Sequence, residues 1–449
     1  MVRVVMLLLA FAFACGPEDV TQVLDTRIVT ADGANPLEGG DYDLLRIVWA
    51  QSGYDTVVQE LDLTGDGFEV GFELDLLASS RARVELTGPS GALLHGAPPQ
   101  FSPAESGLFL RVVVGEPGTC RRVSRLEGAE PARADSAYVR WQGYVIQFGG
   151  MADSGPTTAA TFSDLYYAEA GTPLEDLLEP VGATKAAFFG STTALVLAAN
   201  GTWTYELDGA QVEGDERAAP KLLYDSAGIG SAIVRTGEGV VLVAGGGDAS
   251  SPDVGIARVA TNGRAVLSGL IGARAFAGAA PAGTSDVIVA GGTRAPGAPF
   301  VEWVDMSTLA ITTVDDPATE AVRNEPLVLE GESSHWIVGG TDAAGDPITT
   351  SWVLSGCPEA CALEPGPEVD VRTAPRADGL TLTDGLSVFT AVEAGGWHLE
   401  PVADLARERN AAGIVVYESG MVFLHGGRDP DGPHLDGELC FPAELTPLD

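Results

Sequence analysis

The sequence has little positive charge. Its 449 residues include 25 lysines and arginines against 63 aspartates and glutamates, so the formal net charge is −38. A chain this acidic repels phosphate backbones and anionic headgroups, which excludes nucleic-acid binding and adsorption to a membrane surface. The five histidines are scattered without metal-type spacing. The sequence motifs of common hydrolases and of phosphate-binding loops are missing as well.

Long hydrophobic runs are also missing. The N-terminal run, residues 4–14, is eleven apolar residues long and follows Arg3. Eleven residues are too few for a helix that spans a bilayer. They fit the hydrophobic region of a secretory signal peptide. Residues 1–15 are therefore predicted to be a signal peptide with a lipobox-like end.

Two outcomes of processing stay open at this end. Lipidation of Cys15 would place the protein in the cell envelope, anchored to the outer membrane. Ordinary signal-peptidase cleavage is the alternative, because Ala12-Phe13-Ala14 also satisfies the A-x-A rule. In both cases the mature chain folds in an oxidising compartment, where disulfides persist.

Cysteines are few and odd in number: Cys15, Cys120, Cys357, Cys361 and Cys440. Lipidation of Cys15 would account for the odd one. The short spacing of Cys357 and Cys361 favours a disulfide that closes one turn. A metal-binding thiolate pair is the alternative, but no further Cys or His lies close by in the sequence. By elimination, Cys120 is expected to pair with Cys440.

Glycine and proline are abundant, with 57 and 28 residues beside 45% hydrophobic residues. This composition is typical of a turn-rich, globular, all-β protein. Short apolar runs that end in a glycine pair recur, and two hidden repeats are expected in the wide gaps, around Ala199 and Ala391. The average period is about 46 residues, which predicts seven units. The pairs are Gly149 and Gly150, Gly245 and Gly246, Gly291 and Gly292, Gly339 and Gly340, and Gly426 and Gly427.

Each unit has an apolar segment before its glycine-terminated run and a further strand candidate after the next loop. Four antiparallel strands in about 46 residues are typical of a propeller blade. The units resemble the kelch repeat, whose blades carry a glycine pair after the second strand and a Tyr and a Trp later, although these two are irregular here. The resemblance covers residues 119–449 and implies a seven-bladed kelch-like β-propeller.

The last unit shows one strand after Gly427 and lacks a fourth. The stretch from Thr119 to Leu126 precedes the first complete unit and has no unit of its own. We expect it to be the outer strand of the last unit, which removes an unpaired edge. This closure would put Cys120 beside Cys440, in agreement with the pairing by elimination.

Residues 16–118 show no glycine-pair period but hold six or seven alternating segments, which predict an Ig-like β-sandwich acting as a stalk. Asp62, Thr64, Asp66 and Glu73 have the spacing of an EF-hand calcium loop. The flanking segments alternate with period two, as strands do. A β-hairpin turn is therefore expected here, calcium is the weaker alternative, and no other cofactor is expected.

The predicted function is a non-catalytic binding scaffold for a protein or glycan partner, acting as a monomer whose membrane contact is the N-terminal lipid alone. The alternative is a glycan-active hydrolase or lyase, which would hold paired carboxylates of raised pKa in the propeller channel. Antiparallel geometry puts the post-glycine loops and the inter-blade loops on one side. Acidic residues of those loops form the expected binding face: Asp153, Asp248, Asp342, Asp346, Asp429 and Asp431.

Overall fold

The computed structural model is built from β-strands. It describes residues 4–9, 21–38, 40–63, 70–71, 78–101, 109–123, 132–141, 144–164, 169–173, 177, 182, 185–189, 192–198, 201–208, 213–214, 223, 227–228, 230–314, 322–358, 360–369, 376–434 and 436–448. These residues contain no helix, so none of their segments crosses a membrane as one. The predicted all-β fold class is confirmed for this part of the chain.

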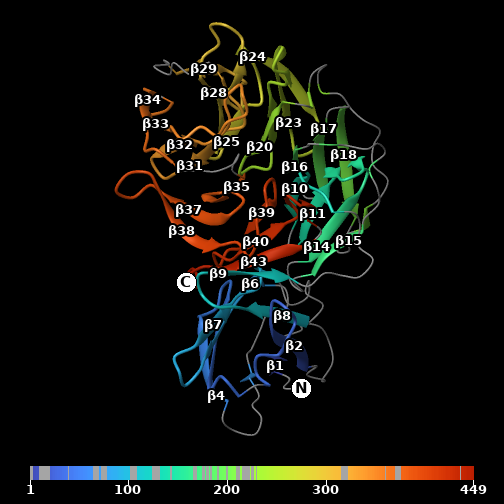
Figure 1. Ribbon diagram of the computed structural model, residues 1–449, viewed down its shortest axis with the longest axis vertical. Helices are drawn as coiled ribbons and strands as arrows, with labels where there is room; N and C mark the ends of the chain where they lie inside the picture. Colours follow the sequence, from blue (N-terminus) through green and yellow to red (C-terminus); the bar gives the residue numbers. More distant parts are fainter. Residues whose placement is uncertain are drawn as a thin grey trace.

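Strands up to Val114 form two four-stranded sheets below the rest of the molecule (Figure 1). One sheet has the order β5-β1-β2-β8 and comprises β5 (Val70–Gly71), β1 (Val4–Leu9), β2 (Thr21–Thr30) and β8 (Phe109–Val114). The other has the order β4-β3-β6-β7 and comprises β4 (Val57–Asp62), β3 (Leu44–Gln51), β6 (Ser80–Thr87) and β7 (Leu93–Gly96). Both sheets contribute to one buried core, with Ile28 and Val112 facing Trp49. The region is therefore a two-layer sandwich.

The predicted hairpin at Asp62 is wrong. Strand β4 ends at Asp62 and pairs with β3, whereas β5 pairs with β1 in the other sheet. The chain thus crosses from one sheet to the other, because period-two alternation identifies strands but not their partners. Thr64, Asp66 and Glu73 lie outside the described residues.

Cys15 also lies outside the described residues, and its processing stays a prediction. In the intact chain, the apolar run before Cys15 contributes β1, which pairs with β2.

After the sandwich, the strands form successive four-stranded antiparallel units, each named here by its innermost strand. The β10 unit comprises β10 (Ala137–Trp141), β11 (Tyr144–Phe148), β14 (Ala160–Asp164) and β15 (Glu169–Pro173). The β16 unit comprises β16 (Lys185–Phe189), β17 (Thr193–Ala198), β18 (Gly201–Asp208) and β19 (Glu213–Gly214). The β20 unit comprises β20 (Ala232–Arg235), β21 (Val241–Ala244), β23 (Ser251–Val259) and β24 (Ala265–Ala275).

The second half of the chain continues the pattern. The β25 unit comprises β25 (Gly278–Ala282), β26 (Asp286–Ala290), β28 (Val301–Asp305) and β29 (Ile311–Thr313). The β31 unit comprises β31 (Leu327–Glu330), β32 (Ser334–Val338), β33 (Trp352–Ser355) and β34 (Ala362–Pro365). The β35 unit comprises β35 (Arg376–Asp378), β36 (Thr381–Thr383), β37 (Ser387–Val392) and β38 (His398–Asp404). The β39 unit comprises β39 (Gly413–Val416), β40 (Val422–His425), β43 (Gly437–Phe441) and β9 (Thr119–Val123).

Short strands join or decorate these units. They are β12 (Met151–Ala152), β13 (Gly155–Pro156), β22 (Gly247–Asp248), β27 (Gly292–Arg294), β30 (Val322–Arg323), β41 (Arg428–Asp429) and β42 (Gly432–Pro433). Strand β27 connects β24 with β30, which links neighbouring units by backbone hydrogen bonds.

The hydrophobic core lies between neighbouring units rather than within one sheet. Phe148 of the β10 unit packs with Trp203 of the β16 unit, and corresponding clusters join each unit to the next around the molecule. The last cluster brings Val145 of the β10 unit against Phe423 of the β39 unit, so the series returns to its start. A closed ring of antiparallel sheets packed face to face is a β-propeller.

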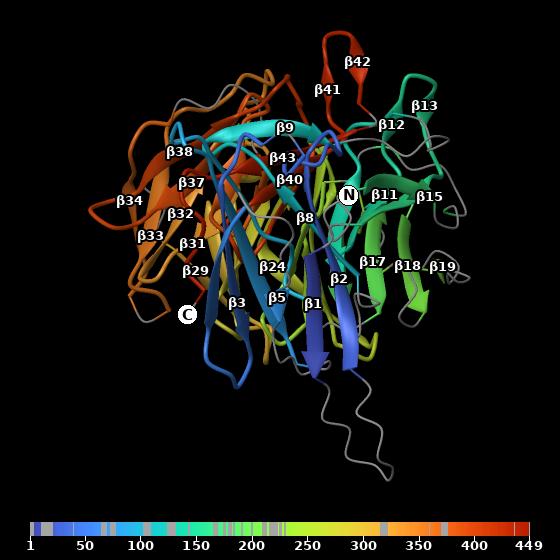
Figure 2. The same ribbon diagram turned by 90° about the horizontal axis from the view of Figure 1, so that it is seen from below.

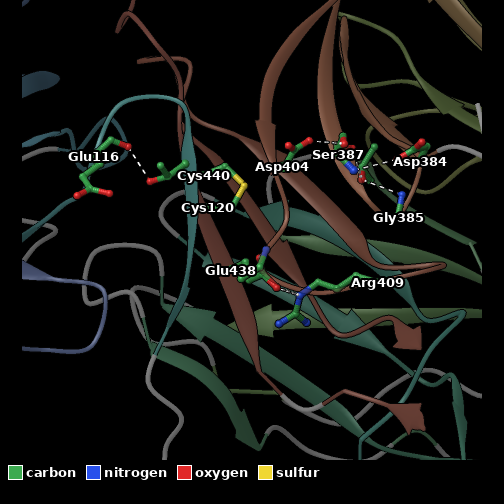
Figure 3. The surroundings of a disulfide bond; sticks show 12 residues. Glu116, Cys120, Asp384, Gly385, Ser387, Asp404, Arg409, Glu438 and Cys440 are labelled. Atoms are coloured by element: carbon green, nitrogen blue, oxygen red, sulfur yellow. Dashed lines mark hydrogen bonds and ion pairs between the residues drawn. A yellow bond between two sulfur atoms is a disulfide. The ribbon is translucent and has the colours of Figure 1, made fainter. Parts of the chain in front are cut away.

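The ring closes through the first strand of the propeller region, as predicted. Strand β9 pairs antiparallel with β43, and the register puts Cys120 opposite Cys440. The two cysteines form a disulfide (Figure 3). Cys357 and Cys361 form the other, also as predicted. Two disulfides are typical of a protein that folds in an oxidising, exported environment.

The repeated glycine pairs follow the second strand of their units for a conformational reason. In each of the five pairs both glycines have positive φ, for example 65° at Gly291 and 86° at Gly292. Only glycine adopts this region without a steric cost. At Gly292 an added Cβ would also lie 2.4 Å from the carbonyl oxygen of Ala275. The pair therefore lets the chain turn sharply against the next unit.

The hidden repeat near Ala391 has a different register from the predicted one. Leu386 to Ala391 cover most of the third strand of that unit, β37, and the second strand is β36. Asp384-Gly385 follows β36 and occupies the place of the glycine pair, with φ 87° at Gly385. An aspartate in the first position hid the repeat from a search for two glycines.

The sandwich packs against the β39 unit instead of extending from it as a separate stalk. Ala97 and Val113 of the sandwich share a buried cluster with Met421, Phe423 and Phe441. The backbone N–H of Ala97 donates to the Met421 sulfur at 3.0 Å. Gly115, at the end of the sandwich, packs so closely that an added Cβ would lie 2.3 Å from the Phe441 ring. A larger residue does not fit at this position.

Candidate functional site

The candidate site is a cavity of about 270 Å³ at the centre of the ring. Every innermost strand contributes to its wall, at or just before the start of the strand. The lining residues are Ser136, Ala137, Tyr138, Lys185, Ala186, Ala232, Ile233, Ala277, Gly278, Ala279, Glu325, Pro326, Leu327, Arg376, Ala377, Ala412, Gly413 and Ile414. Most are small or apolar, so the charged side chains stand out as the groups that can select a ligand.

Lys185 and Glu325 form an ion pair across this cavity. The Lys185 Nζ lies 3.3 Å from Glu325 Oε1 and donates to the carbonyl oxygen of Ser231 at 3.1 Å. Lys185 lowers the pKa of the Glu325 carboxyl and Arg376 lowers it further, which together outweigh the opposing effect of burial. The carboxylate is therefore ionised at neutral pH. The side chains of Lys185 and Glu325 are 26% and 35% exposed, so both can reach a ligand in the cavity.

Arg376 gives the cavity a second cation. Its guanidinium lies 3.7 Å from the carboxylate of Asp135, which precedes β10. Asp135 and Glu325 both have positive φ, at 55° and 50°, and each stands two residues before its innermost strand. Positive φ is unusual for residues other than glycine and persists where the surroundings fix it. The turn before the innermost strand thus places Glu325 in the wall of the cavity and Asp135 beside Arg376.

In several units a buried arginine lies just before the turn that leads into the innermost strand. Arg133, Arg274, Arg323 and Arg409 are all at most 2% exposed. In three units the guanidinium donates to the carbonyl oxygen of the first glycine of the pair, as Arg409 does to Gly426 at 2.8 Å. These arginines stand 17 or 18 residues before the second glycine. That spacing is readable in the sequence, although the glycine pairs alone do not reveal it.

Two of these arginines have a buried carboxylate partner. Arg274 lies 3.0 Å from Glu302 and Arg409 lies 2.7 Å from Glu438, and all four side chains are fully buried. Arg133 and Arg323 bind a threonine hydroxyl instead. Buried charges require such partners because desolvation alone is costly. These groups fix the ring around the cavity, and they do not line it.

The acidic loops that we expected to bind a partner lie on the same side as the cavity mouth. The second strand of each unit ends beside the start of the innermost one, as Phe148 opposite Ala137 shows. Figure 2 shows the hairpins β12–β13 and β41–β42 side by side. A Cβ on Gly432 would lie 3.6 Å from the Asp153 carboxylate, which brings the first and last of these loops together.

Several of these carboxylates bind their own loop. Asp248 accepts the N–H groups of Ser250 and Ser251, and Asp342 accepts those of Ala344 and Asp346. Asp429 accepts the N–H of Asp431. The aspartate that follows a glycine pair is thus a turn-forming residue. The binding face itself stays a prediction.

The described residues contain no cluster of three or more His, Cys, Asp or Glu side chains arranged for a metal ion. His425, next to a glycine pair, is fully enclosed, and burial together with Arg133 and Arg409 lowers its pKa to about 3. It is therefore a neutral packing residue. The calcium hypothesis is untested, since of its four residues only Asp62, at the end of β4, is described.

The described geometry defines an all-β protein in which a β-propeller carries a docked sandwich. No known family model matches the chain, and no curated protein sequence matches it. A solved structure titled "Structure of YjhT" is similar at 12% identity, with a TM-score of 0.39, over 63% of this chain and 94% of that chain. At this TM-score the similarity carries no argument. The fold assignment therefore depends on the strand pairings and cores described above.

Proposed function

We propose that the protein is an exported, non-catalytic binding scaffold that holds a glycan or protein group at the mouth of its central cavity. The propeller is seven-bladed and kelch-like, the sandwich is Ig-like, and Cys15 carries a lipid that anchors the chain to the outer membrane. The kelch-like assignment is supported by the recurring glycine pairs and the four-stranded units between them. One observation carries the binding role: a cavity lined by every innermost strand, with Lys185, Glu325 and Arg376 in its wall.

The charges favour binding over hydrolysis. A glycosidase needs a carboxylic acid of raised pKa to protonate the leaving group. The pKa of Glu325, the carboxyl in the described wall, is lowered by Lys185. A lysine, an arginine and a carboxylate around a small cavity instead provide donors and an acceptor for hydroxyl, amide or carboxylate groups. Such a set can orient a polar ligand without proton transfer.

The test is a panel of defined polysaccharides, oligosaccharides and peptides, measured with the full chain by calorimetry and by product analysis. Lys185→Met combined with Glu325→Gln removes the pair without leaving one charge alone. We expect this variant to lose at least tenfold in affinity for any ligand of the parent protein. Arg264→Gln, an exposed change outside the cavity, is the matched control and should bind normally.

Two results would contradict the proposal. Ligands that bind the double variant as well as the parent would place the binding site elsewhere. Product formation from any member of the panel would show an enzyme and support the glycan-active alternative. Because folding of each variant can be checked by its melting temperature, loss of binding through unfolding is recognised separately.

A further inference from the structure

An exposed apolar edge lies on the side of the propeller away from the sandwich. Strand β24 is the outer strand of its unit and stands at the top of Figure 1. Ile271 is 62% exposed and Leu267 is 56% exposed, and Val266 on the same strand and Val254 on β23 are exposed as well. In the part of the chain that is described, residues 265–271 have no strand on their outer side; beyond them the N–H of Gly272 donates to Glu302, and the carbonyl oxygen of Ala273 accepts the N–H of Ala295. An edge of this kind is a template for strand pairing.

The same region lacks acidic residues. From Val254 to Ser285 there are 32 residues without Asp or Glu, in a chain where about one residue in seven is acidic. Two copies of a protein with net charge −38 repel one another over most of their surfaces. This edge is a place where two copies can approach without bringing acidic side chains together. The charge pattern therefore points to a second copy of the chain as the occupant.

The strand is also complementary to itself. A two-fold axis through Gly269, with the two copies of β24 antiparallel, places Leu267 of one copy opposite Ile271 of the other, and the reverse. Leu267, Gly269 and Ile271 are all exposed while Leu270 is buried, so Leu267 and Ile271 lie on one face of the strand, although the pairing of β24 with β23 shifts in register beyond Gly269. Self-complementarity about a two-fold axis is what an isologous dimer requires. Gly269 itself carries no side chain that could hold the backbones apart.

From this edge we propose that the protein forms a homodimer by antiparallel pairing of β24 with β24 of a second copy, around Gly269. The sequence led us to expect a monomer, because composition does not show which strand is left at an edge. In the dimer the propeller sheets of the two copies join into one continuous sheet. Figure 1 places the sandwich at the end of the molecule opposite β24, so this pairing puts the two sandwiches far from the interface.

The first test is the molar mass of the full chain in solution, by sedimentation over micromolar concentrations. We expect twice the mass of one chain, which is 46.3 kDa before any processing at Cys15. Ile271→Asp should raise the dimer dissociation constant at least tenfold, because it buries a charge and removes an apolar contact. Val58→Asp is the matched control, since Val58 is 48% exposed on the edge strand β4 of the sandwich. A monomeric parent protein, or an Ile271→Asp variant that dimerises fully, would overturn the proposal.

The second test does not depend on the stability of a charged variant. Residue 269 meets its own copy on the axis, so Gly269→Cys should form a disulfide-linked dimer under mild oxidation. An added Cβ there makes only ordinary contacts, the nearest at 3.5 Å. Gly237→Cys, at an exposed glycine in a turn of the same unit, should not cross-link. Equal cross-linking of both variants would show random collision and would contradict this interface.

Discussion

The two ends of strand β39 belong to two different surfaces. At its start, Gly413 and Ile414 line the central cavity beside charged side chains. Just after its end, Tyr417 and Met421 are buried against the sandwich. The turn from Thr236 to Val240 has the same hydrogen bonds as the turn from Tyr417 to Met421, but no domain packs on it in the described chain. One face of the propeller is therefore open and polar, and the other is covered at one unit.

This difference indicates how the chain separates binding from attachment. Apolar contacts and a disulfide hold the covered side, where the N-terminal region enters the ring. The open side holds ionised groups that are exposed by about a quarter to a third, and such partly solvated groups contribute little to stability. Changes on the covered side should therefore act on folding, and changes on the open side should act on ligands.

The largest effect is expected from opening the ring. Cys120→Ser with Cys440→Ser should lower the free energy of unfolding by about 5 kcal/mol, since the disulfide closes a very long loop. The matched control is Cys357→Ser with Cys361→Ser, whose loop is short, so about 2 kcal/mol is expected. Denaturant unfolding of both variants measures the difference. Equal losses would mean that closure by β9 does not stabilise the ring.

The next effect concerns the covered face directly. Phe441 is fully buried and contacts the sandwich at Gly115. Phe441→Ala should cost about 3–5 kcal/mol, because it leaves a cavity between the two domains. Val58→Ala, at an exposed position, should stay within about 0.5 kcal/mol of the parent protein. Thermal unfolding with separate signals for the two domains would show whether they then unfold apart. If Phe441→Ala is as stable as Val58→Ala, the sandwich is not docked there.

Acid should weaken the closure of the ring at a defined pH. Burial alone would raise the pKa of Asp436, but Arg409, Arg122 and Arg407 more than offset it and lower the pKa to about 2. A lowered pKa gives stability that is present above the ordinary value of 3.8 and is lost as the pH falls toward 2. About 2 kcal/mol should be lost over this range. Asp436→Asn should be less stable near neutral pH and should show a flatter pH profile. An unchanged profile would contradict the role of Asp436.

The smallest effect on stability is expected at the open face. Glu325→Gln should change the free energy of unfolding by less than about 1 kcal/mol, because the Lys185 pair is partly solvated. Ligand affinity should change nonetheless. If Glu325→Gln instead lowers the free energy of unfolding by several kcal/mol, the cavity wall is a structural element, and the two faces do not differ as described.

Much of this fold could be read from local patterns. The glycine pairs identified the repeat because positive φ at both positions restricts the choice to glycine. The missing fourth strand then predicted both the closure by β9 and the pairing of Cys120 with Cys440. The same logic failed where another residue fills the position, as Asp384 does in the β35 unit. The glycine pairs also do not reveal the buried arginines, which lie at a regular spacing before them.

The cavity and the docked sandwich could not be predicted in the same way. Lys185, Glu325 and Arg376 come from three different units and share no motif, so the ring itself brings them together. Ala97 and Met421 are more than 300 residues apart in the chain. An alternating strand pattern shows that one face is buried, but not what covers it. The separate stalk and the hairpin at Asp62 were both predicted from the alternating pattern, which does not identify what packs against a strand or pairs with it.

Methionine oxidation compares the two faces most directly. Met151 lies on the open side in β12 and is partly exposed, whereas Met421 is fully buried and its sulfur accepts the N–H of Ala97. Dilute peroxide on the native chain, followed by peptide mass mapping, measures both rates in one sample. The account predicts fast oxidation of Met151 and at least tenfold slower oxidation of Met421. Oxidation of Met421 at the rate of Met151 would contradict a sandwich docked on the covered face of the propeller.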